Sequence, residues 1–407
     1  MLPNNEYMTY PPTTNFTIGL MGPIETASFK DILPPPGNQP YPKGLGGSPV
    51  NLMARELHLR GYNLILFSLD PSVDTEITIK SERLTIHFGP YRPKHARDFF
   101  AVEIKWLTQA VLKQPPDILH AHWTNEFALA AQATGLPHLV TAHDAPFNIL
   151  RLNFIPYRIA CTLMSCKAIW NARYLSVVSP YVADHLKKFM FYRRPTRVIS
   201  NGMPESIFNR IRTAKPADAP LTFATILVGW SGLKNGEAAI QAFALLHNTL
   251  PDCRLIMFGA GHGANEPAEQ WAKTQGLQEG IEFVGQLPYE QLIQRLSDEV
   301  DIIIHPSLEE SQGMALIEPM AMGIPVIAGQ DSGAVPWTVD NGKAGILVDI
   351  TQPKQIANAM LKLANDSTER QRIGQAGLMN AKKRFHIRVV TDAYLQAYQD
   401  ILQENWT

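Results

Sequence analysis

The sequence predicts an α/β protein made of two doubly wound domains, and three observations predict it. A chain of 407 residues is longer than one ordinary hydrophobic core organises. Short apolar runs alternate with helical patterns along the chain, as in parallel sheets covered by helices on both faces. A polar, proline-containing stretch, MPESIFNRIRTAKPADAP, separates these runs into two groups. We therefore expect an amino-terminal domain over 1–205, a second domain over 206–385, and a last helix over 386–407 that crosses back to the first domain.

The expected strands are short apolar runs bounded by turn residues. The first group reads FTIGLMG, YNLILFS, LTIHFGP, DILHAHW, HLVTAHD, YLSVVSP and TRVISNG. The second group reads FATILVG, RLIMFGA, IEFVGQL, DIIIHPS, PVIAGQD and AGILVDI. Ligands of doubly wound sheets bind beyond the carboxyl ends of the strands. Functional residues are therefore expected in the loops that follow these runs.

The composition argues against several classes of protein. Hydrophobic residues make up 45% of the chain and charged residues 18%, as in ordinary globular proteins, and the formal net charge of -1 gives no general attraction to nucleic acid. The first residues lack the basic and apolar regions of a secretory signal, and no apolar run approaches the roughly 20 residues of a spanning helix. We expect a cytoplasmic protein, peripheral at the inner face of a membrane at most.

Metal chemistry is not predicted. The three cysteines are an odd number and lack the paired short spacings of a zinc site. His120 and His122 lie two apart at the end of an expected strand, so their side chains share a face and could hold a metal. No third ligand lies near them in the sequence, and no Asp-x-Asp motif occurs on an expected loop.

The strongest functional pattern follows the run DIIIHPS. Glu310 and Glu318 bracket a loop that enters a helix at Gly313. The free N–H groups at a helix start favour a phosphate, and carboxylates accept hydrogen bonds from vicinal hydroxyls. The alternative interpretation makes both glutamates solvated residues of a helix face. Pro319, which breaks the helical hydrogen-bond pattern beside Glu318 in an otherwise apolar stretch, favours the functional interpretation.

The run from Glu310 to Glu318 resembles the E-x7-E motif of retaining GT-B glycosyltransferases, specifically the group-one transferases of glycosyltransferase family four. The surrounding segment HPSLEESQGMALIEPMAMGIPVIAG is similar to the donor-site motif of that family along its whole length. The resemblance covers most of the chain, because Gly46 and Gly47 match the family's amino-terminal Gly-Gly loop and further segments follow in the expected order. It implies two Rossmann-like domains that face a central cleft.

The resemblance also implies a donor site. Its donor-binding residues would be Gly46, Gly47, Lys234, Val284, Leu287, Glu310, Gly313, Met314, Ala315 and Glu318. In this family Glu318 would bind the ribose, Glu310 the transferred sugar, and the backbone from Val284 to Leu287 the base. The residues at the reaction centre would be His143, Lys234 and Glu310. For His143 the alternative is a structural histidine, although its position at the end of a strand favours the site.

One departure from the family pattern concerns the leaving diphosphate. The family usually carries an Arg and then a Lys after the first strand of the second domain, and this chain reads VGWSGLKNG there. Lys234 can fill the role of the Lys, but Trp230 stands in place of the Arg. A tryptophan does not neutralise a phosphate, although it can stack or shape a pocket. Another cation substitutes for the Arg, or the donor differs, or activity is low.

The expected reaction is transfer of a sugar from a nucleotide diphosphate, a UDP- or GDP-sugar, to an acceptor hydroxyl with retention and without a cofactor. A non-catalytic relative that binds sugar nucleotides is one alternative, because a fold and site can persist without chemistry. A nicotinamide-dependent oxidoreductase is another, because GAGHGA, from Gly259 to Ala264, fits G-x-G-x-x-A after an expected strand and Glu282 follows at a suitable distance. Glu282 falls at the start of its strand, which disfavours ribose contact.

Two segments bear on the acceptor, a saccharide or lipid-linked molecule. The segment KKFMFYRR, within 187–197, combines basic and aromatic residues and could rest on an anionic membrane, or it could be a solvated basic face. The proline-rich stretch from Pro23 to Gly44 is expected to be a mobile loop that meets the acceptor, with a plain surface excursion as the alternative. The donor base, donor sugar and acceptor identity are not encoded in a readable pattern.

Overall fold

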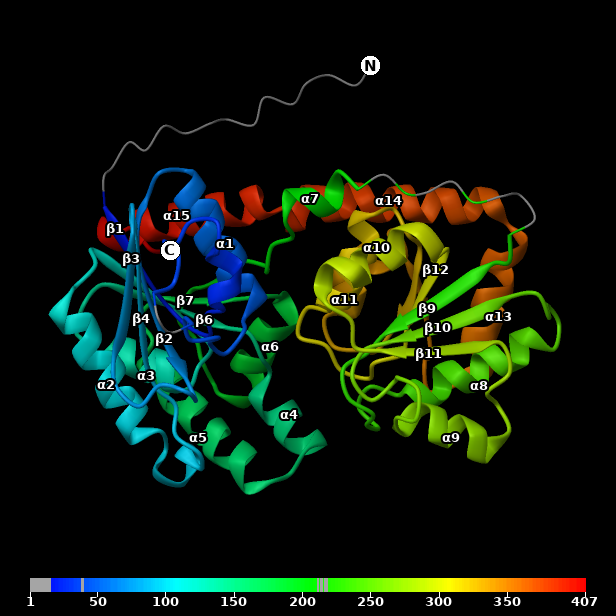
Figure 1. The fold of residues 1–407 in the computed structure, drawn as a ribbon, viewed down its shortest axis with the longest axis horizontal. Coiled ribbons are helices and arrows are strands. Elements are labelled where there is room, and N and C mark those ends of the chain that lie inside the picture. Colours follow the sequence, from blue (N-terminus) through cyan, green and yellow to red (C-terminus); the bar gives the residue numbers. More distant parts are fainter. Residues whose placement is uncertain (1–15, 38–39, 211, 213–214, 216–218) are drawn as a thin grey trace, which may run out of the picture. The chain divides into compact units, whose positions relative to one another are not determined.

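The computed structural model describes residues 16–37, 40–210, 212, 215 and 219–407. The chain packs into two compact units. Unit 1 comprises residues 1–176, 186–197 and 391–407, and unit 2 comprises residues 177–185 and 198–390. The first sheet has eight strands and the second has six, and helices cover both sheets (Figure 1).

The first sheet has the strand order β3-β4-β2-β1-β5-β6-β7-β8. Pairing is parallel where its register is defined, from β4 to β6, and β3 alone is antiparallel to its neighbour β4. The strands are β1 (Thr17–Met21), β2 (Asn63–Asp70), β3 (Ile77–Ser81), β4 (Leu84–Pro90), β5 (Ile118–His122), β6 (His138–Ala142), β7 (Leu175–Val177) and β8 (Thr196–Val198). All seven runs predicted for this domain form strands, and β3 is an additional one.

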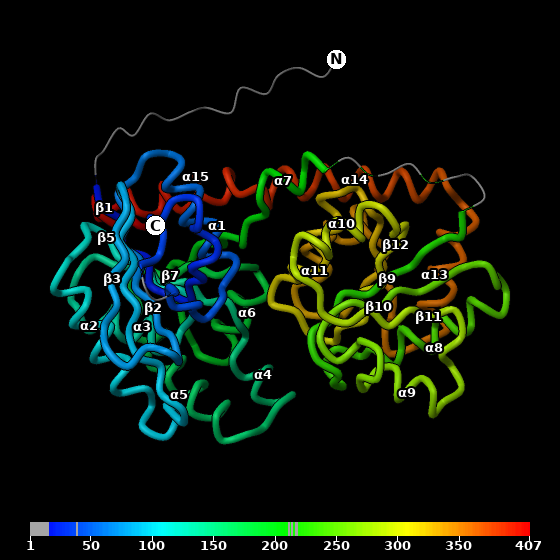
Figure 2. Tube along the Cα trace, in the orientation of Figure 1, coloured from blue at the N-terminus to red at the C-terminus, as the bar shows by residue number. Residues whose placement is uncertain are grey.

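The helices that accompany the first sheet begin mostly in the loops after its strands. They are α1 (Ser48–Leu59), α2 (Ala101–Lys113), α3 (Glu126–Ala133), α4 (Pro146–Leu152), α5 (Pro156–Asn171), α6 (Pro180–Phe189) and α15 (Ile387–Leu402), with 3-10 helices η1 (Thr26–Phe29) and η2 (His95–Asp98). Helix α15 is the last helix of the chain, yet its residues from Thr391 onwards belong to unit 1 (red in Figure 2). It is anchored there by Tyr394 and Tyr398, which are fully buried against His120 of β5.

The second sheet is entirely parallel in the order β11-β10-β9-β12-β13-β14. Its strands are β9 (Thr222–Ile226), β10 (Arg254–Phe258), β11 (Ile281–Gly285), β12 (Ile302–His305), β13 (Val326–Gly329) and β14 (Ile346–Val348). The helices are α7 (Glu205–Phe208), α8 (Gly236–His247), α9 (Pro267–Gln275), α10 (Tyr289–Glu299), α11 (Met314–Ala321), α12 (Val335–Thr338), α13 (Pro353–Asn365) and α14 (Ser367–Phe385), with the 3-10 helix η3 (Asp340–Gly342). All six predicted runs form strands.

Alternation along the strands of unit 2 builds two hydrophobic layers. Ala224, Ile256 and Ile303 lie in one buried cluster with residues of α10, α11 and α14. The neighbouring positions Phe223 and Leu255 lie in a second cluster with residues of α8 and α13. Successive residues of a strand point to opposite faces, so a run that is apolar at every position needs helices on both sides. The loops that carry the predicted site residues of unit 2 follow the carboxyl ends of these strands.

Candidate functional site

The loop after β12 carries the predicted motif, and buried hydrogen bonds hold it in place. The side chain of Gln312 is buried, accepts a hydrogen bond from the backbone N–H of Asn201 at 2.8 Å and donates one to its carbonyl at 3.1 Å. Thr338 donates from its hydroxyl to the carbonyl of Gln312 at 2.6 Å. The turn from Ser311 to Gly313 is therefore fixed before any ligand binds.

Glu310 and Lys234, both predicted site residues, form an ion pair. Lys234 Nζ lies 2.7 Å from Glu310 Oε1, and His305 Nε2 lies 3.2 Å from the same oxygen. The backbone N–H of Leu308 donates to the carbonyl of Leu233 at 2.9 Å, which joins the loop of Lys234 to the loop of Glu310. His305 was not predicted, although its place at the carboxyl end of β12 was a usable indication.

The electrostatics of this cluster keep Glu310 ionised. Burial by itself would raise the pKa of Glu310, but the hydrogen bond from His305 and the charges of His305 and Lys234 outweigh it and lower the pKa to about 2. The side chain of Glu310 is 17% exposed, so it is more enclosed than a surface loop residue. A partly buried carboxylate with a cation beside it can hold a hydroxyl-rich ligand and place that cation next to a phosphate.

Helix α11 begins directly after this loop. Gly313 is its N-terminal cap and has φ 82°, a left-handed conformation that favours glycine. Met314 and Ala315 are the first two residues of the helix, so their backbone N–H groups are free of helical partners. The helix continues past Pro319 to Ala321, where it ends. The predicted helix start is present, with the positive end of its dipole beside Glu310.

Glu318 differs from Glu310 in its protonation. It lies in the second turn of α11 and is half-buried. Burial raises the pKa of Glu318 to about 7, and a hydrogen bond from Tyr289 opposes that shift. Tyr289, at the start of α10, was not identified from the sequence. A carboxyl group held near half-ionisation can accept or donate hydrogen bonds to a pair of hydroxyls.

The predicted base-binding segment lies near the same helix. Val284, Leu287 and Met314 are half-buried and pack against one hydrophobic cluster that includes Leu316 of α11. Gly285 has φ 77°, and a Cβ there would lie 2.9 Å from the Cα of Gly263. The chain at the end of β11 therefore turns sharply beside an apolar surface on which a base can rest.

Trp230, which stands in place of the family's Arg, is a packing residue in this structure. Its ring lies 5.5 Å from that of His262 and 5.8 Å from that of Trp271. Gly236 leaves room for it, because a Cβ at that position would lie 2.8 Å from Trp230 Cζ3. Its half-buried side chain belongs to the hydrophobic cluster beneath α8 and α13. Among the predicted cations of this loop, Lys234 alone is present.

Gly46 and Gly47 lie directly before α1 in unit 1. Gly46 has φ 83° and Gly47 has φ 97°, and Gly47 is the N-terminal cap of the helix. A Cβ at Gly47 would lie 2.3 Å from the carbonyl oxygen of Pro23, so this position excludes a side chain. The loop presents bare backbone at a helix start, as its predicted contact with a phosphate requires.

His143 belongs to a row of buried histidines in unit 1. His122 Nδ1 lies 3.0 Å from His143 Nε2, and the ring of Trp123 stacks on His143 at 4.2 Å. The rings of His120 and His122 lie 4.0 Å apart, so they share one face of β5 as predicted. Burial lowers the pKa of His143 to about 3 and that of His122 well below its usual value. Both rings are neutral at pH 7.

The neutral pair determines which nitrogen of His143 carries the proton. The hydrogen bond between His122 Nδ1 and His143 Nε2 needs one donor and one acceptor. His122 Nε2 is buried and has no partner among the described residues. A buried N–H without an acceptor costs more free energy than a buried lone pair without a donor, so His122 Nε2 carries no proton. The proton of His122 is therefore on Nδ1, which donates to His143 Nε2. His143 therefore carries its proton on Nδ1 and offers a ligand a donor there.

His120 is used inside the fold rather than as a ligand for metal. Its Nδ1 lies 2.7 Å from the hydroxyl of Tyr398, and its Nε2 lies 2.6 Å from Thr141 Oγ1. No group of three or more His, Cys, Asp or Glu side chains within the described part of the chain is placed to hold a metal ion. Glu282, the acid of the oxidoreductase alternative, lies in the edge strand β11 and forms an ion pair with Arg295 at 3.0 Å. Its carboxylate is therefore already paired within the protein.

Comparison with known proteins gives agreement over both halves of the chain. Residues 230–379 match the family model described as glycosyl transferases group 1, and residues 50–206 match the model described as Glycosyltransferase Family 4. A D-inositol 3-phosphate glycosyltransferase of Stackebrandtia nassauensis is 26% identical, with 90% of each chain covered. The lipopolysaccharide core biosynthesis glycosyltransferase LpsE of Rhizobium meliloti is 25% identical over 66% of this chain and 74% of its own length.

Solved structures match the whole fold. Sucrose-phosphate synthase from Thermosynechococcus elongatus aligns with a TM-score of 0.71 at 19% identity, covering 96% of this chain and 100% of its own. Anabaena HepE in complex with UDP-glucose aligns with a TM-score of 0.64 at 16% identity, covering 95% of this chain and 100% of its own. These likenesses show that the chain has the fold of those structures, with two doubly wound units.

Proposed function

Since the chain belongs to the glycosyltransferases of group one and family four and has the GT-B fold, we propose that it transfers a sugar from a nucleotide diphosphate to an acceptor hydroxyl with retention of configuration. The observation that carries this proposal is the ion pair of Lys234 with Glu310 beside the free N–H groups of α11. UDP is the first choice of nucleotide, because the HepE structures contain UDP and UDP-glucose. A GDP-sugar is the second choice.

Cleavage of the sugar–phosphate bond builds positive charge on the sugar ring and negative charge on the leaving diphosphate. Lys234 stabilises the leaving oxygens together with the N–H groups of Met314 and Ala315 and the backbone at Gly46 and Gly47. Glu310 orients Lys234 before the donor binds and accepts hydrogen bonds from the transferred sugar. The mechanism needs no metal ion, no cofactor and no strong protein nucleophile.

The remaining site residues position the donor. Glu318 holds the ribose hydroxyls, and its raised pKa of about 7 makes that contact dependent on pH near neutrality. His143 donates from Nδ1 to an oxygen of the donor sugar, which its neutral ring does without adding a positive charge. Val284 and Leu287 support the base. Each role is the one that the family resemblance assigns to the matching position of this chain.

Thermal stabilisation by sugar nucleotides tests the donor site directly. A ligand present at about 100 times its dissociation constant adds about 2.7 kcal/mol to the free energy of unfolding. We expect UDP-glucose or another UDP- or GDP-sugar to raise the unfolding temperature of the wild-type protein, and Glu318→Ala to abolish the shift. Glu290→Ala, at an exposed glutamate of the same unit, is the matched control and should keep it. An unchanged shift in Glu318→Ala would remove Glu318 from the site.

A non-catalytic sugar-nucleotide-binding protein is the second candidate, because Trp230 occupies the place of a phosphate-binding Arg. Assay of sugar transfer and of nucleotide release against a panel of donors distinguishes the two. Turnover with any donor excludes the non-catalytic protein. Donor binding with neither transfer nor nucleotide release would favour it.

The acceptor is a saccharide or lipid-linked molecule, and contact with a membrane through residues 187–197 is part of the proposal. Phe189 is 44% exposed and Phe191 is 72% exposed, beside Lys187 and Lys188. Met190 and Tyr192 are buried instead, and Arg194 donates to the carbonyl of Ala172, so only part of the segment can meet lipid. No helix of the described chain is long and apolar enough to cross a bilayer.

Cosedimentation with vesicles decides whether this surface binds a membrane. We expect binding that rises with anionic lipid and falls in the variant Lys187→Glu/Phe191→Ser. Binding that is absent or independent of anionic lipid would end this part of the proposal and leave the transferase activity untouched.

A further inference from the structure

The described residues of the proline-rich stretch between β1 and α1, 23–37 and 40–44, form hydrogen bonds with one another and with α1. Residues Thr26–Phe29 form η1, and the backbone N–H of Thr26 donates to the carbonyl of Lys43 at 3.2 Å. Arg55 of α1 donates to the carbonyl of Ser28 and pairs with Asp31 at 2.6 Å. These contacts join the described residues to the body of unit 1, and the mobility of the loop stays a prediction.

This segment encloses a hollow of about 380 Å³, within the range of small-molecule sites. Its lining is mostly apolar and comprises Thr26, Ala27, Lys30, Leu33, Pro34, Pro35, Pro36, Tyr41, Pro42 and Lys43. Leu33 and Pro42 are buried, whereas the three consecutive prolines expose their rings. Prolines lose little conformational entropy when a ligand binds. The binding of an apolar group to this surface therefore carries a small entropic cost.

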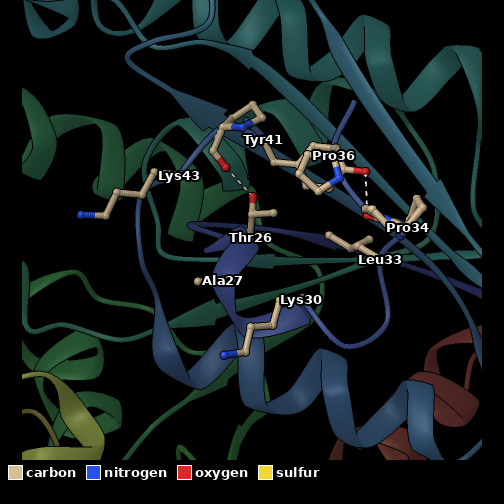
Figure 3. A pocket seen from close by; sticks show the side chains of 10 residues that line it. Thr26, Ala27, Lys30, Leu33, Pro34, Pro36, Tyr41 and Lys43 are labelled. Atoms are coloured by element: carbon tan, nitrogen blue, oxygen red, sulfur yellow. Dashed lines mark hydrogen bonds between the residues drawn. The ribbon is translucent and has the colours of Figure 1, made fainter. Parts of the chain in front are cut away.

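The uncharged polar side chains of the lining are already used within the pocket wall. Thr26 donates from its hydroxyl to the carbonyl of Pro42 at 2.5 Å, and Tyr41 donates from its hydroxyl to the carbonyl of Pro34 at 3.0 Å (Figure 3). A polyol in this hollow would therefore find few free partners for its hydroxyls. The interior suits an alkyl or prenyl chain better than a bare sugar.

Two lysines supply the only charges of the lining. The ammonium groups of Lys30 and Lys43 lie on the same side of the pocket, with Leu33, Pro34 and Pro36 on the other side (Figure 3). Both residues are exposed, and neither forms an ion pair with a described residue. Two exposed cations at one side of an apolar hollow fit an anionic group joined to an apolar one.

We propose that this pocket, lined by residues of 26–36 and 41–43, binds an amphipathic anion, an apolar chain that carries a phosphate. The inference rests on the proposed function, in which such a molecule is the acceptor or its carrier. The chain occupies the surface of Leu33 and the prolines, and the phosphate lies between Lys30 and Lys43. Lys43 precedes Gly46 by three residues, so the anionic end lies next to the loop assigned to the donor diphosphate.

Calorimetric titration with decyl phosphate tests the pocket without knowledge of the natural ligand. We expect saturable binding that persists when the protein is saturated with UDP. Inorganic phosphate lacks the chain, decanol lacks the charge, and D-inositol 3-phosphate carries hydroxyls in place of the chain, so each should bind at least tenfold more weakly. Equal binding of D-inositol 3-phosphate, or no saturable binding of decyl phosphate, would overturn the proposal.

Variants locate the binding and serve as controls. Lys30→Glu/Lys43→Glu should weaken binding of decyl phosphate at least fivefold, and Ala27→Trp, which fills the hollow from an exposed position, should abolish it. Lys80→Glu, at an exposed lysine of β3 outside the pocket, is the matched control for charge and should bind as the wild type does. Thermal unfolding verifies that each variant is folded. Unchanged binding in both pocket variants would place the ligand elsewhere and refute the assignment.

A second arm distinguishes a soluble source from a membrane-bound one. Phosphatidylcholine vesicles with and without a prenyl phosphate are cosedimented with the wild type and with Lys30→Glu/Lys43→Glu. If the protein cosediments with the vesicles only when the prenyl phosphate and both lysines are present, the ligand is lipid-linked. If the protein binds decyl phosphate but does not cosediment with the vesicles, the ligand is soluble. Thermal stabilisation by UDP-glucose is measured in parallel, so that failure of the donor site and failure of this pocket are separate results.

Discussion

Units 1 and 2 each place polar side chains at the carboxyl ends of parallel strands, but they treat charge in opposite ways. In unit 1 His122 and His143 form a neutral pair whose pKa values burial lowers. In unit 2 Lys234 and His305 surround Glu310 and lower its pKa to about 2, so that it stays charged. Parallel strands of the same kind therefore end in an uncharged histidine pair in unit 1 and in a charged cluster in unit 2.

Removal of the cation in unit 2 should have the largest effect. We expect Lys234→Ala to lower kcat for sugar transfer by about 10²–10³-fold, because it removes a stabilising charge from the leaving group and leaves Glu310 with His305 as its remaining partner. Steady-state kinetics measure this. Lys273→Ala, at an exposed i,i+4 pair of α9, is the control and should leave kcat unchanged. A loss below threefold in Lys234→Ala would mean that Lys234 does not meet the diphosphate.

The neutral pair of unit 1 should make that unit sensitive to mild acid. The pKa of His143 is lowered from 6.5 to about 3, so the unfolded chain binds a proton that the folded chain does not between these values. Its stabilising contribution is therefore complete above pH 6.5 and is lost as the pH falls, by about 2 kcal/mol at pH 5. The contribution of Glu310 has the same sign but is lost only between its usual pKa of 4.5 and about 2.

Hydrogen exchange of the amides of β5 and β6 between pH 6.5 and 5 measures this difference. We expect the free energy of opening in the wild type to fall with pH and the slope to be smaller by about one proton in His143→Asn. The β12 amides, beside Glu310, should show no such dependence on His143. An identical slope in the wild type and the variant would mean that His143 is not held neutral.

The hydroxyl of Tyr398 supports the histidine row from α15. Tyr398→Phe should lower the free energy of unfolding by about 1–2 kcal/mol, because it leaves His120 Nδ1 buried without a partner. Denaturant unfolding measures this. Tyr62→Phe, at another buried tyrosine of unit 1, is the control and should cost less than about 0.5 kcal/mol, because its hydroxyl forms no hydrogen bond with a described residue. Equal losses in both variants would show that His120 does not depend on Tyr398.

The last prediction concerns the tautomer of His143. Nitrogen-15 spectra of labelled histidines should show His143 with its proton on Nδ1 in the wild type. In His122→Phe, which keeps an aromatic ring but removes the donor, we expect the fraction protonated on Nε2 to rise. A wild-type His143 protonated on Nε2 would reverse the direction of the hydrogen bond inferred from the partnerless nitrogen of His122.

The sequence was sufficient for most of the fold, because both faces of each sheet are covered and the strands are apolar at nearly every position. Strand β3 was missed for the opposite reason: it is an edge strand with one fully buried residue, Ile79, and its pattern resembles a surface loop. In unit 2, Glu310 and Glu318 came from a motif of fixed spacing and Lys234 from the separate segment VGWSGLKNG, and Lys234 and Glu310 do meet. The roles assigned to these residues remain predictions.

Contacts that depend on how loops fold could not be predicted from the sequence. His305 reaches Glu310 because the chain turns back within five residues, and Tyr289 reaches Glu318 from a different helix. The ring of Trp230 has room because residue 236 is a glycine, which no local pattern distinguishes. The pocket from Thr26 to Lys43 likewise depends on hydrogen bonds to backbone carbonyls, which leave no mark in the residue pattern.

The position of α15 has a consequence for biosynthesis. Unit 1 is assembled from segments that are far apart in the chain, so a ribosome releases most of its sheet long before it releases Tyr394 and Tyr398. Until residue 398 has emerged, His120 has no tyrosine to bond and its polar ring must be hydrated or covered by another molecule. The nascent amino-terminal half is therefore an incompletely folded intermediate until α15 has been synthesised. A fragment that ends at the boundary between the two halves lacks this helix and should be less stable than unit 1 in the full chain.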